Sequence, residues 1–420
     1  MDYRKLNELV QYARKNAPLY GALYLNLPEV VEDVTELPVI DHTSFWSANT
    51  IADNQVLTAP LTEAVVYKTG GSTGAPKFAC YTRGEWDDFA TDIGLDMASN
   101  GLRSGHRVAN LFYAGELYAS FMLFGQSLTS ITMDTVRLPV AGSAPPEVIH
   151  QVLADFSVEV VMGTPTTLCR VANYLLEHDH QQTSVEYLFF SGEPVFSDQR
   201  RLLLAAFPNA EICSLVYGSV DGGLIGHALR GPDQRVFRAP TRDAIIEILD
   251  DDTGEPIREP GRSGRLIKTD LRRRLMPILR YPVGDRAEWL DFESGLFRLQ
   301  GRHAEGVRLG PVTIYTEDVR RVANELTAAD AIIGMQLVAY RADGRDGMVV
   351  RLAARPDFTG TEATGVEFVT RLNTSRPMIP EHVDAGMIHP VKVEWKRYNE
   401  LAVNPRTGKL RAVIDERPTD

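Results

Sequence analysis

Apolar runs and helical stretches alternate along residues 84–230, and this alternation is the strongest constraint that the sequence places on the fold. Short apolar runs that suit strands occur at 107–113, 158–162, 186–190 and 211–217. Longer stretches with helical spacing lie between them, such as 166–178 and 197–206. This order is typical of a mostly parallel sheet covered by helices. We therefore predict an α/β core.

The segments on either side of this core have patterns of their own. Residues 3–16 carry apolar side chains at helical spacing, and Pro18 is expected to end that helix. Short strands with turn signals at 245–249, 265–269 and 288–290 predict an antiparallel subdomain. A small α+β pattern follows. We predict a large N-terminal domain at 1–301 and a small C-terminal domain at 302–420, with a hinge near 301–304.

Composition limits the class of partner. The chain has 420 residues, which is enough for two or three domains with well-buried cores. Its formal charge of -12 argues against a nucleic acid or an acidic membrane as the main ligand, because such binding uses basic patches. No apolar run reaches about 18 residues and residues 1–22 lack a signal-peptide pattern, so we expect a cytoplasmic protein.

The cysteines indicate neither a metal site nor a disulfide framework. Cys80, Cys169 and Cys213 are far apart in the sequence and lie beside no histidine pair. We expect them to be small buried hydrophobic residues.

A glycine-rich loop follows the β-branched run at 64–68 and predicts a phosphate-binding site. Three glycines remove the Cβ atoms that would block close approach of the backbone to an anion, namely Gly70, Gly71 and Gly74. Hydroxyl donors come from Thr69, Ser72 and Thr73, and Lys77 adds a positive charge. The spacing is not that of a Walker A loop, since no Ser or Thr follows the lysine.

Small and glycine-rich turns follow the expected strands, where ligands gather in open α/β sheets. These turns lie at 113–116, 163–165, 191–194 and 217–223. The carboxyl ends of the strands are therefore the expected place for the active site.

Together these motifs resemble those of the adenylate-forming (acyl-activating) enzymes. The glycine-rich loop resembles T-S-G-[ST]-T-G-x-P-K, residues 217–221 resemble Y-G-x-[ST]-E, and residues 277–285 resemble P-x-x-R-Y-x-x-G-D. Residues 191–194 resemble the G-[AG]-E-P loop, and residues 404–411 resemble the P-x-x-x-G-K-x-x-R loop. The Arg280-Tyr281 pair and the short length place the resemblance closest to the phenylacetate-CoA ligase branch.

The resemblance implies a nucleotide site that draws on most of these motifs. Asp285 would hold both ribose hydroxyls, a task that suits a carboxylate because it accepts two hydrogen bonds at once. Tyr217 would stack on adenine, with Asp221 as the Mg²⁺ ligand. The adenine-side and neighbouring residues would be Gly192, Glu193, Pro194, Gly218 and Ser219.

Two positions depart from the family pattern. Asp221 is one methylene shorter than the usual glutamate. Gly301-Arg302 resembles the G-R-x-D hinge motif, in which Arg302 would reach ribose or phosphate oxygens. The hinge aspartate position falls on Ala304, or on Glu305 if the gap is placed differently. This puts rotation of a mobile small domain in question.

Lys409 is the candidate catalytic residue, because a fixed ammonium would stabilise negative charge that develops as pyrophosphate leaves. Phe112, Tyr113 and Gly218 are the candidate acid-pocket residues, and aromatic residues there suit a flat aromatic acid.

The implied reaction joins a carboxylic acid to ATP as an acyl-adenylate and then transfers the acyl group to coenzyme A. A second reading is an adenylating enzyme that passes its acyl group to a carrier protein or a reductase. A third, of another class, is a nucleotide-binding protein that has lost ligation. Similar enzymes are often dimers, so a homodimer is a further expectation.

Overall fold

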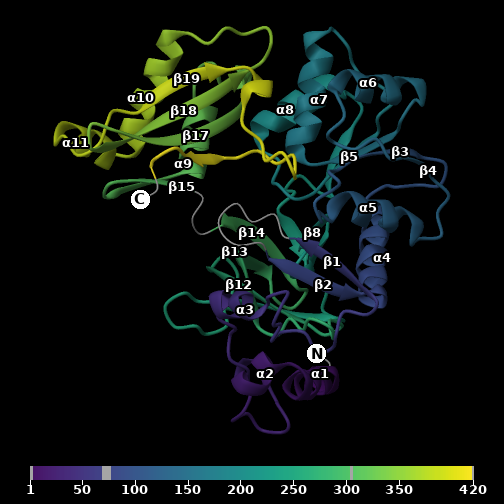
Figure 1. Ribbon diagram of the computed structural model, residues 1–420. Helices are drawn as coiled ribbons and strands as arrows, with labels where there is room; N and C mark the ends of the chain where they lie inside the picture. The colour runs from purple at the N-terminus through teal and green to yellow at the C-terminus, as the bar shows by residue number, and fades with distance from the viewer. Residues whose placement is uncertain (1–2, 69–76, 303–305, 419–420) are drawn as a thin grey trace. The chain divides into compact units, whose positions relative to one another are not determined.

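The computed structural model describes residues 3–68, 77–302 and 306–418 (Figure 1). The chain divides into two compact units. Unit 1 consists of Met1–Ala141, Phe189–Pro194 and Cys213–His303. Unit 2 consists of Gly142–Leu188, Val195–Ile212 and Ala304–Asp420. The predicted domains at 1–301 and 302–420 are each one continuous segment, whereas each unit of the structure consists of three segments. The predicted domains stay a prediction.

Unit 1 begins with short helices that pack on the segment leading into one strand of the antiparallel sheet. These are α1 (Tyr3–Asn16), α2 (Pro18–Leu23), the 3-10 turn η1 (Val34–Glu36) and α3 (His42–Ala48). The predicted helix at 3–16 is confirmed, and its apolar face is buried. That face shares one core with Met276, Ile278, Leu279 and Tyr281. The N-terminal helices therefore support the segment that carries the R-Y-x-x-G-D motif.

The glycine-rich loop connects two paired strands. β1 (Ala64–Lys68) and β2 (Phe78–Thr82) are antiparallel, with Lys68 opposite Phe78. Thr82 then caps α4 (Arg83–Ser99): its side chain accepts from the Glu85 N–H, while the Glu85 carboxylate accepts from the Thr82 N–H. This reciprocal cap satisfies donors that the first helical turn leaves unpaired. The end of β2 is thereby fixed.

The predicted α/β core is confirmed. A five-stranded sheet has the order β4-β3-β5-β6-β7, and β3 pairs in parallel with β4. Its strands are β3 (Arg107–Leu111), β4 (Val136–Leu138), β5 (Val160–Gly163), β6 (Tyr187–Phe190) and β7 (Glu211–Ser214). The accompanying helices are α5 (Ser120–Thr129), α6 (Pro146–Asp155), α7 (Pro165–Glu177) and α8 (Ser197–Ala206). All four residues of β5 are buried, as its unbroken apolar run predicts.

The predicted single strand at 211–217 is wrong, because the chain changes sheets within it. β7 ends at Ser214 and β8 (Val216–Ser219) begins an antiparallel sheet. Leu215 lies between them, fully buried, and its N–H donates to the Phe190 carbonyl over 2.8 Å. Apolar residues continue from Ile212 to Tyr217 with only Ser214 between them, so the sequence pattern does not show where one sheet ends and the next begins.

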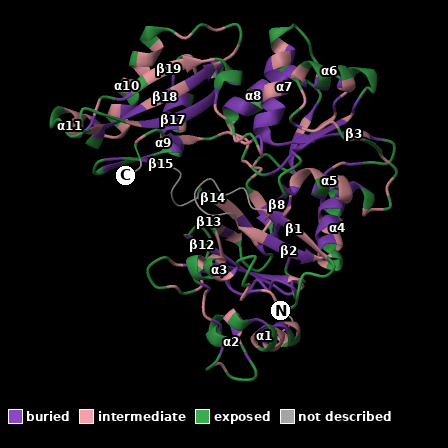
Figure 2. Cartoon of the chain, in the orientation of Figure 1, coloured by how far each residue is buried: buried purple, intermediate pink, exposed green. Residues whose placement is uncertain are grey.

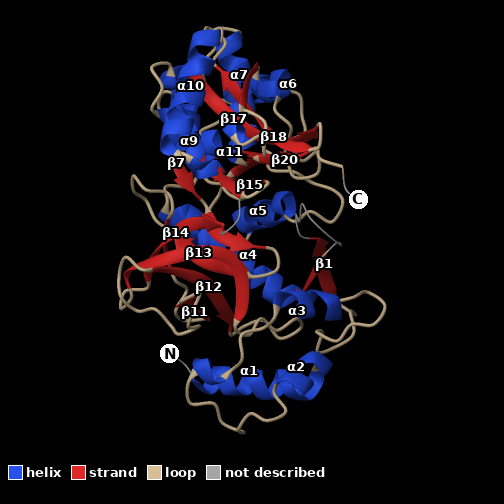
Figure 3. Ribbon diagram, turned by 90° about the vertical axis from the view of Figure 1, so that its left-hand side faces the viewer, coloured by secondary structure: helices blue, strands red, loops and turns tan. Residues whose placement is uncertain are grey.

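The antiparallel part is a seven-stranded sheet of order β11-β12-β13-β14-β10-β9-β8. It includes β9 (Gly223–Ala228), β10 (Val236–Arg238), β11 (Ala244–Leu249), β12 (Ser263–Asp270), β13 (Tyr281–Asp291) and β14 (Leu296–Arg302). Figure 3 shows β11 to β14 as neighbouring strands. The strands predicted at 245–249 and 265–269 are confirmed. The strand predicted at 288–290 is only the end of β13, which begins at Tyr281 and contains Asp285.

This sheet is strongly curved. The Lys268 ammonium on β12 donates to the Leu224 carbonyl on β9, although β13, β14 and β10 lie between those strands in the sheet. The enclosed core is apolar and contains Phe237, Trp289 and Phe297. Curvature therefore brings distant strands of one sheet within side-chain reach.

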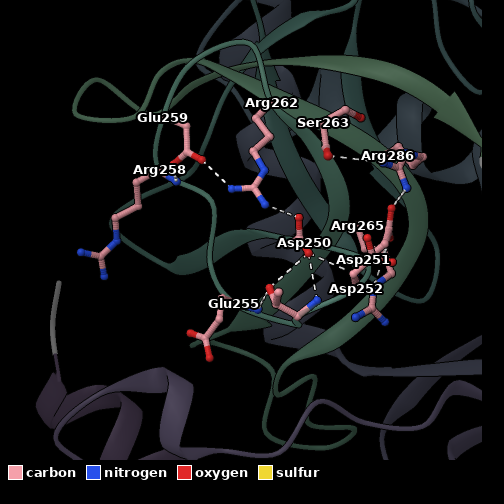
Figure 4. Close-up of polar contacts among 11 residues, drawn as sticks. Asp250, Asp251, Asp252, Glu255, Arg258, Glu259, Arg262, Ser263, Arg265 and Arg286 are labelled. Atoms are coloured by element: carbon pink, nitrogen blue, oxygen red, sulfur yellow. Dashed lines mark hydrogen bonds and ion pairs between the residues drawn. The ribbon is translucent and has the colours of Figure 1, made fainter.

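A network of ion pairs lies at the β11–β12 connection (Figure 4). Asp250 accepts from the backbone of Asp252 and Thr253 and pairs with Arg262, while Asp251 pairs with Arg265 and Arg286. Arg286 follows Asp285 on β13 and also donates to the Ser263 carbonyl. The network therefore ties β13 to the β11–β12 connection beside Asp285.

In unit 2, residues 306–418 form an α+β fold, as predicted. A hairpin of β15 (Gly306–Leu309) and β16 (Val312–Tyr315) precedes a sheet of order β19-β18-β17-β20. The sheet strands are β17 (Ile332–Ala342), β18 (Arg345–Ala354), β19 (Lys392–Lys396) and β20 (Val413–Asp415). The helices are α9 (Thr316–Asn324), α10 (Glu362–Ser375) and α11 (Met378–Asp384), with 3-10 turns η2 (Ala329–Ala331) and η3 (Tyr398–Glu400). Figure 2 shows buried residues along β17 and β18 and exposed residues on α10 and α11.

Within unit 2, a polar contact joins α8 to α9. The Arg320 guanidinium donates to both oxygens of the buried Asp198, over 2.9 and 2.8 Å, and lies over the Phe196 ring.

All three cysteines are buried, as predicted. Within the described parts of the chain, no helix is long and apolar enough to cross a membrane.

Arg280 and Glu247 form a buried bidentate ion pair whose rupture should destabilise unit 1. The Arg280 Nε and Nη2 donate to the two Glu247 oxygens over 3.1 and 2.9 Å, and each side chain is 6 % exposed. Glu247→Ala leaves a buried guanidinium without its counter-charge, which costs about 3–5 kcal/mol. Urea unfolding followed by fluorescence should show a correspondingly lower midpoint.

The matched control for this prediction is Glu259→Ala. Glu259 pairs with Arg262, but the two side chains are 55 % and 51 % exposed, so solvent replaces the contact. The control should unfold like the wild type. Equal midpoints for Glu247→Ala and the wild type would contradict the structural role of the buried pair.

Candidate active site

The hairpin of β8 and β9 carries four of the predicted site residues. Tyr217, Gly218 and Ser219 lie on β8 itself, and Asp221 lies in the turn before β9. A Cβ at Gly218 would lie 2.7 Å from the Gly223 carbonyl oxygen, so only glycine fits there. The Ser219 hydroxyl accepts from the Gly222 N–H over 2.9 Å and closes the turn.

Two buried cations, Lys268 and Arg273, donate to backbone carbonyls of this turn. The Lys268 ammonium donates to the Gly222 carbonyl over 2.6 Å and to Asp270 over 2.8 Å. Burial lowers the pKa of Lys268, whereas Lys268 and Arg273 lower the pKa of Asp270 in spite of its burial. Arg273 donates to the carbonyls of Cys80 and Asp221 and lies over the Tyr81 ring. The backbone that carries Asp221 is thus fixed by charged groups.

Two tyrosine–carboxylate hydrogen bonds join this hairpin to β13. The Tyr217 hydroxyl donates to Asp285 Oδ2 over 2.7 Å, and the Tyr281 hydroxyl donates to Asp221 Oδ2, also over 2.7 Å. Each partner thus supplies one tyrosine and one aspartate. The two motifs that sequence reasoning assigned to the nucleotide meet in one place within unit 1.

An irregularity in β13 sets the direction of Asp285. The β12–β13 register shifts between Arg265 and Ile267, and Gly284 has a φ of 88°. Such bulges redirect a side chain and favour glycine in the left-handed conformation. The alternation of side chains between the two faces of a regular strand therefore does not apply at Asp285.

Aromatic residues surround both bonds. The Tyr217 ring lies 5.3 Å from the Phe237 ring, which belongs to the apolar core of the curved sheet. The Trp46 indole Nε1 donates to the Tyr281 hydroxyl over 3.0 Å. Burial and the nearby Asp221 carboxylate raise the pKa of Tyr281, so its hydroxyl stays protonated and acts as a donor.

Lys77 lies directly before β2 and close to α3. Its Nζ is 3.4 Å from His42 Nε2 and lies over the Trp46 ring, 5.3 Å from the ring centroid. Burial and the Lys77 charge lower the pKa of His42, which favours a neutral imidazole. Thr69, Gly70, Gly71, Ser72, Thr73 and Gly74 lie outside the described residues.

The adenine-side turn follows β6, next to the start of β8. Gly192 has a φ of 87°, a conformation that glycine adopts without strain, and Glu193 and Pro194 follow it. The bond from the Leu215 N–H to the Phe190 carbonyl brings this turn close to the strand that carries Tyr217. The turn and Tyr217 therefore belong to one part of unit 1.

Other predicted residues lie at the margin of this cluster or elsewhere. In the β13–β14 register, Arg302 is opposite Asp285, so its backbone is at the site. Phe112 is 1 % exposed and its ring stacks on Phe124 at 4.0 Å, so it lies in the core. Tyr113 is also buried. Their assignment to an acid pocket stays a prediction.

Lys409 belongs to unit 2. Its loop is held by the buried Thr407, by the Asn404 N–H bond to the Lys409 carbonyl, and by the Leu410 N–H bond to the Thr166 hydroxyl. Gln336 supports the adjoining backbone by donating to the carbonyls of Ala402 and Arg411. The loop thus presents Lys409 from a defined backbone, and its catalytic role stays a prediction.

Asp221 is suited to a magnesium ion in one respect. Mg²⁺ in nucleotide sites is held by one or two carboxylates together with phosphate oxygens and water. In the described ranges, with residues 69–76 and 303–305 left out, no cluster of three or more His, Cys, Asp or Glu residues could hold a metal. The assignment of Asp221 as the Mg²⁺ ligand therefore rests on its motif and stays a prediction.

Sequence reasoning missed His42, Trp46, Lys268 and Arg273. Lys268 has a detectable signal, because a lone lysine inside the apolar strand at 265–269 must find partners when it is buried. His42 and Trp46 are four residues apart and lie on one side of a short helix, but nothing in the sequence joins them to Lys77.

The chain is similar to known enzymes over its whole length. It matches the family described as AMP-binding enzyme over residues 24–268. It is 26 % identical to the phenylacetate-coenzyme A ligase of Thermus thermophilus, covering 98 % of this chain and 95 % of that one. It is 25 % identical to the phenylacetate-coenzyme A ligase of Aromatoleum evansii, covering 100 % and 94 %.

Among solved structures, a 2-hydroxyisobutyryl-CoA ligase bound to an AMP-linked ligand in the postadenylation state superposes with a TM-score of 0.78. That likeness has 19 % sequence identity and covers 99 % of this chain and 88 % of the other. It supports the α/β architecture with an additional α+β region. Because the family match spans more than half of its residues, the chain belongs to the AMP-binding enzyme family.

Proposed function

We propose that this chain activates an aromatic carboxylic acid with ATP, forming an acyl-adenylate and pyrophosphate, and then transfers the acyl group to coenzyme A. The observation that carries the proposal is the pair of hydrogen bonds Tyr217–Asp285 and Tyr281–Asp221. They bring together residues of two motifs that we predict for adenine, ribose and metal, although each bond joins positions at least 60 residues apart.

The nucleoside end of ATP would lie against Tyr217 and Asp285. The hydrogen bond to Tyr217 fixes the Asp285 carboxylate and the edge of the aromatic ring in relation to each other. A carboxylate held in this way accepts from both hydroxyls of a ribose, and the ring offers its face to adenine. The residues are thus preorganised for a nucleoside, which lowers the entropic cost of binding.

The phosphate end would lie toward Lys77 and Asp221. A carboxylate substrate is already ionised at neutral pH, so the first half-reaction needs little proton transfer and is hindered mainly by charge repulsion. Lys77 would supply fixed positive charge against this repulsion, and the proposed catalytic role of Lys409 is the same kind of charge stabilisation. Mg²⁺, held by Asp221, would neutralise phosphate charge when bound.

The substrate class rests on the relatives. Two relatives that match over nearly the full length of both chains are named phenylacetate-coenzyme A ligases, which supports an arylacetic acid as substrate and coenzyme A as acceptor. A cytoplasmic location and a homodimer remain part of the proposal. Transfer to a carrier protein or a reductase is the alternative that a missing coenzyme A dependence would favour.

The proposal is tested by ATP–pyrophosphate exchange across aromatic, heteroaromatic and aliphatic acids, with and without coenzyme A. We expect exchange with phenylacetate or a close aryl acid, and a thioester product that mass spectrometry detects only with coenzyme A. Exchange with long-chain fatty acids alone would contradict the aryl assignment. Bound ATP without exchange for any acid would favour a non-ligating protein.

Lys409→Ala should strongly lower the rate of adenylation and leave ATP binding intact. The backbone contacts of the loop do not use the Lys409 side chain, so the loop should persist in the variant. Loss of one preorganised charge typically lowers the rate about 10²–10³-fold. Single-turnover adenylate formation and calorimetry with ATP measure the two effects separately.

Lys392→Ala is the control, since it removes an exposed lysine of the same unit. Its adenylation rate should match that of the wild type. An unchanged rate in Lys409→Ala would refute the catalytic assignment.

A further inference from the structure

A hydrogen-bonded chain of side chains connects the two ends of the candidate phosphate site. It begins at Asp221, passes to the Tyr281 hydroxyl over 2.7 Å, and continues to the Trp46 indole N–H over 3.0 Å. The same indole N–H lies 3.2 Å from His42 Nε2, and His42 Nε2 lies 3.4 Å from Lys77 Nζ. All these residues belong to unit 1.

The centre of this chain is α3, which is capped at its start and packed into the core. Asp41 caps the helix by accepting from the Ser44 N–H over 2.8 Å. Phe45 is fully buried, with its ring 5.3 Å from that of Tyr281. His42 and Trp46 are four residues apart and therefore lie on one face of the helix. Their positions are set by the core.

α3 also holds the strand that follows Lys77. Asn49, at the end of α3, is buried and donates to the Phe78 carbonyl over 2.7 Å. Phe78 is the residue directly after Lys77 and the first of β2. The helix thus contacts the lysine side chain at one end and the neighbouring backbone at the other.

The chemistry of His42 suits an acceptor. Both groups that face its Nε2 atom are donors, the Trp46 indole N–H and the Lys77 ammonium. Only a neutral imidazole with its proton on Nδ1 can accept there. A neutral acceptor directs the ammonium without neutralising its charge, whereas a carboxylate in that place would compete with phosphate for the lysine.

We propose that His42 is a positioning residue for Lys77, and that α3 uses it to set where the lysine charge meets the phosphates of ATP. This inference rests on the proposed function. It assigns a role to a residue outside all of the motifs that point to the nucleotide. His42 acts through Lys77 and would not touch the reacting atoms itself.

The experiment is a double-mutant cycle on ATP affinity, measured by calorimetry with MgATP. It uses the wild type, His42→Ala, Lys77→Ala and the double variant. We expect His42→Ala to weaken ATP binding about 10-fold, because a hydrogen bond to a charged group is lost. In the Lys77→Ala background the same substitution should change affinity less than about 2-fold, since coupled residues are non-additive.

His42→Gln separates positioning from packing. The Gln amide oxygen can take the place of Nε2 as an acceptor, so this variant should recover most of the affinity that His42→Ala loses. In steady-state exchange, His42→Ala should raise KM for ATP and leave KM for the acid unchanged. A merely structural role would lower the thermal midpoint and affect both substrates.

Two results would overturn the inference: equal losses from His42→Ala in both backgrounds, or wild-type affinity in His42→Ala. Failure of His42→Gln to recover affinity would also count against an acceptor role. Failure of the proposed function looks different. In that case the wild type itself would catalyse no exchange with any acid, whether or not it binds ATP.

Discussion

The ion pair of Arg280 and Glu247 fixes the start of β13, and the candidate site depends on where β13 begins. Arg280 has a φ of 42°, and its guanidinium also donates to the carbonyls of Thr35 and Leu37. Its own carbonyl accepts from the Ile40 N–H. One residue thus joins β11, β13 and the N-terminal segment. Buried ion pairs add little net stability compared with an apolar core, but removing one partner is costly, and we infer that this pair specifies where β13 begins.

That arrangement places Tyr281 and Asp285 toward the β8–β9 hairpin. Because the sheet curves, the two tyrosine–carboxylate bonds connect strands that are not neighbours. Each bond to a carboxylate contributes about 1.5–3 kcal/mol when formed. Their importance in the proposed function is geometric, since they hold the residues predicted for adenine, ribose and metal at fixed separation. The α3 helix extends the same principle to Lys77.

Much of the fold could be predicted from the sequence because its signals are local. The buried strand at 160–163, the helix at 165–177 and the helix at 3–16 follow from apolar spacing and proline. The switch of sheets at Leu215 could not be predicted, because an apolar run looks the same in either sheet. The sequence predicts only the end of β13, at 288–290. The first half of this strand contains Pro282, Gly284 and Asp285, which are unusual in a regular strand.

The site residues also divide into those that the sequence predicts and those that it does not. Tyr217, Asp221 and Asp285 were found through motifs, and the structure joins them by contacts that the motifs do not state. Tertiary contacts define the places of His42, Trp46 and Lys268. The Trp46–Tyr281 bond, for example, joins residues 235 positions apart, and no local sequence pattern predicts such a contact. Lys409 was found by its motif alone, and its placement in unit 2 leaves its role to experiment.

The most direct test of this account compares ATP with 2′-deoxy-ATP and 3′-deoxy-ATP by calorimetry, in the wild type and in Asp285→Ala. If Tyr217 holds Asp285 for the ribose, the wild type should bind each deoxy analogue about 10-fold more weakly than ATP, as expected for a lost charge-assisted hydrogen bond. Asp285→Ala should bind all three nucleotides equally. Equal affinities in the wild type, or discrimination that survives in Asp285→Ala, would contradict the assignment of this cluster to the nucleotide.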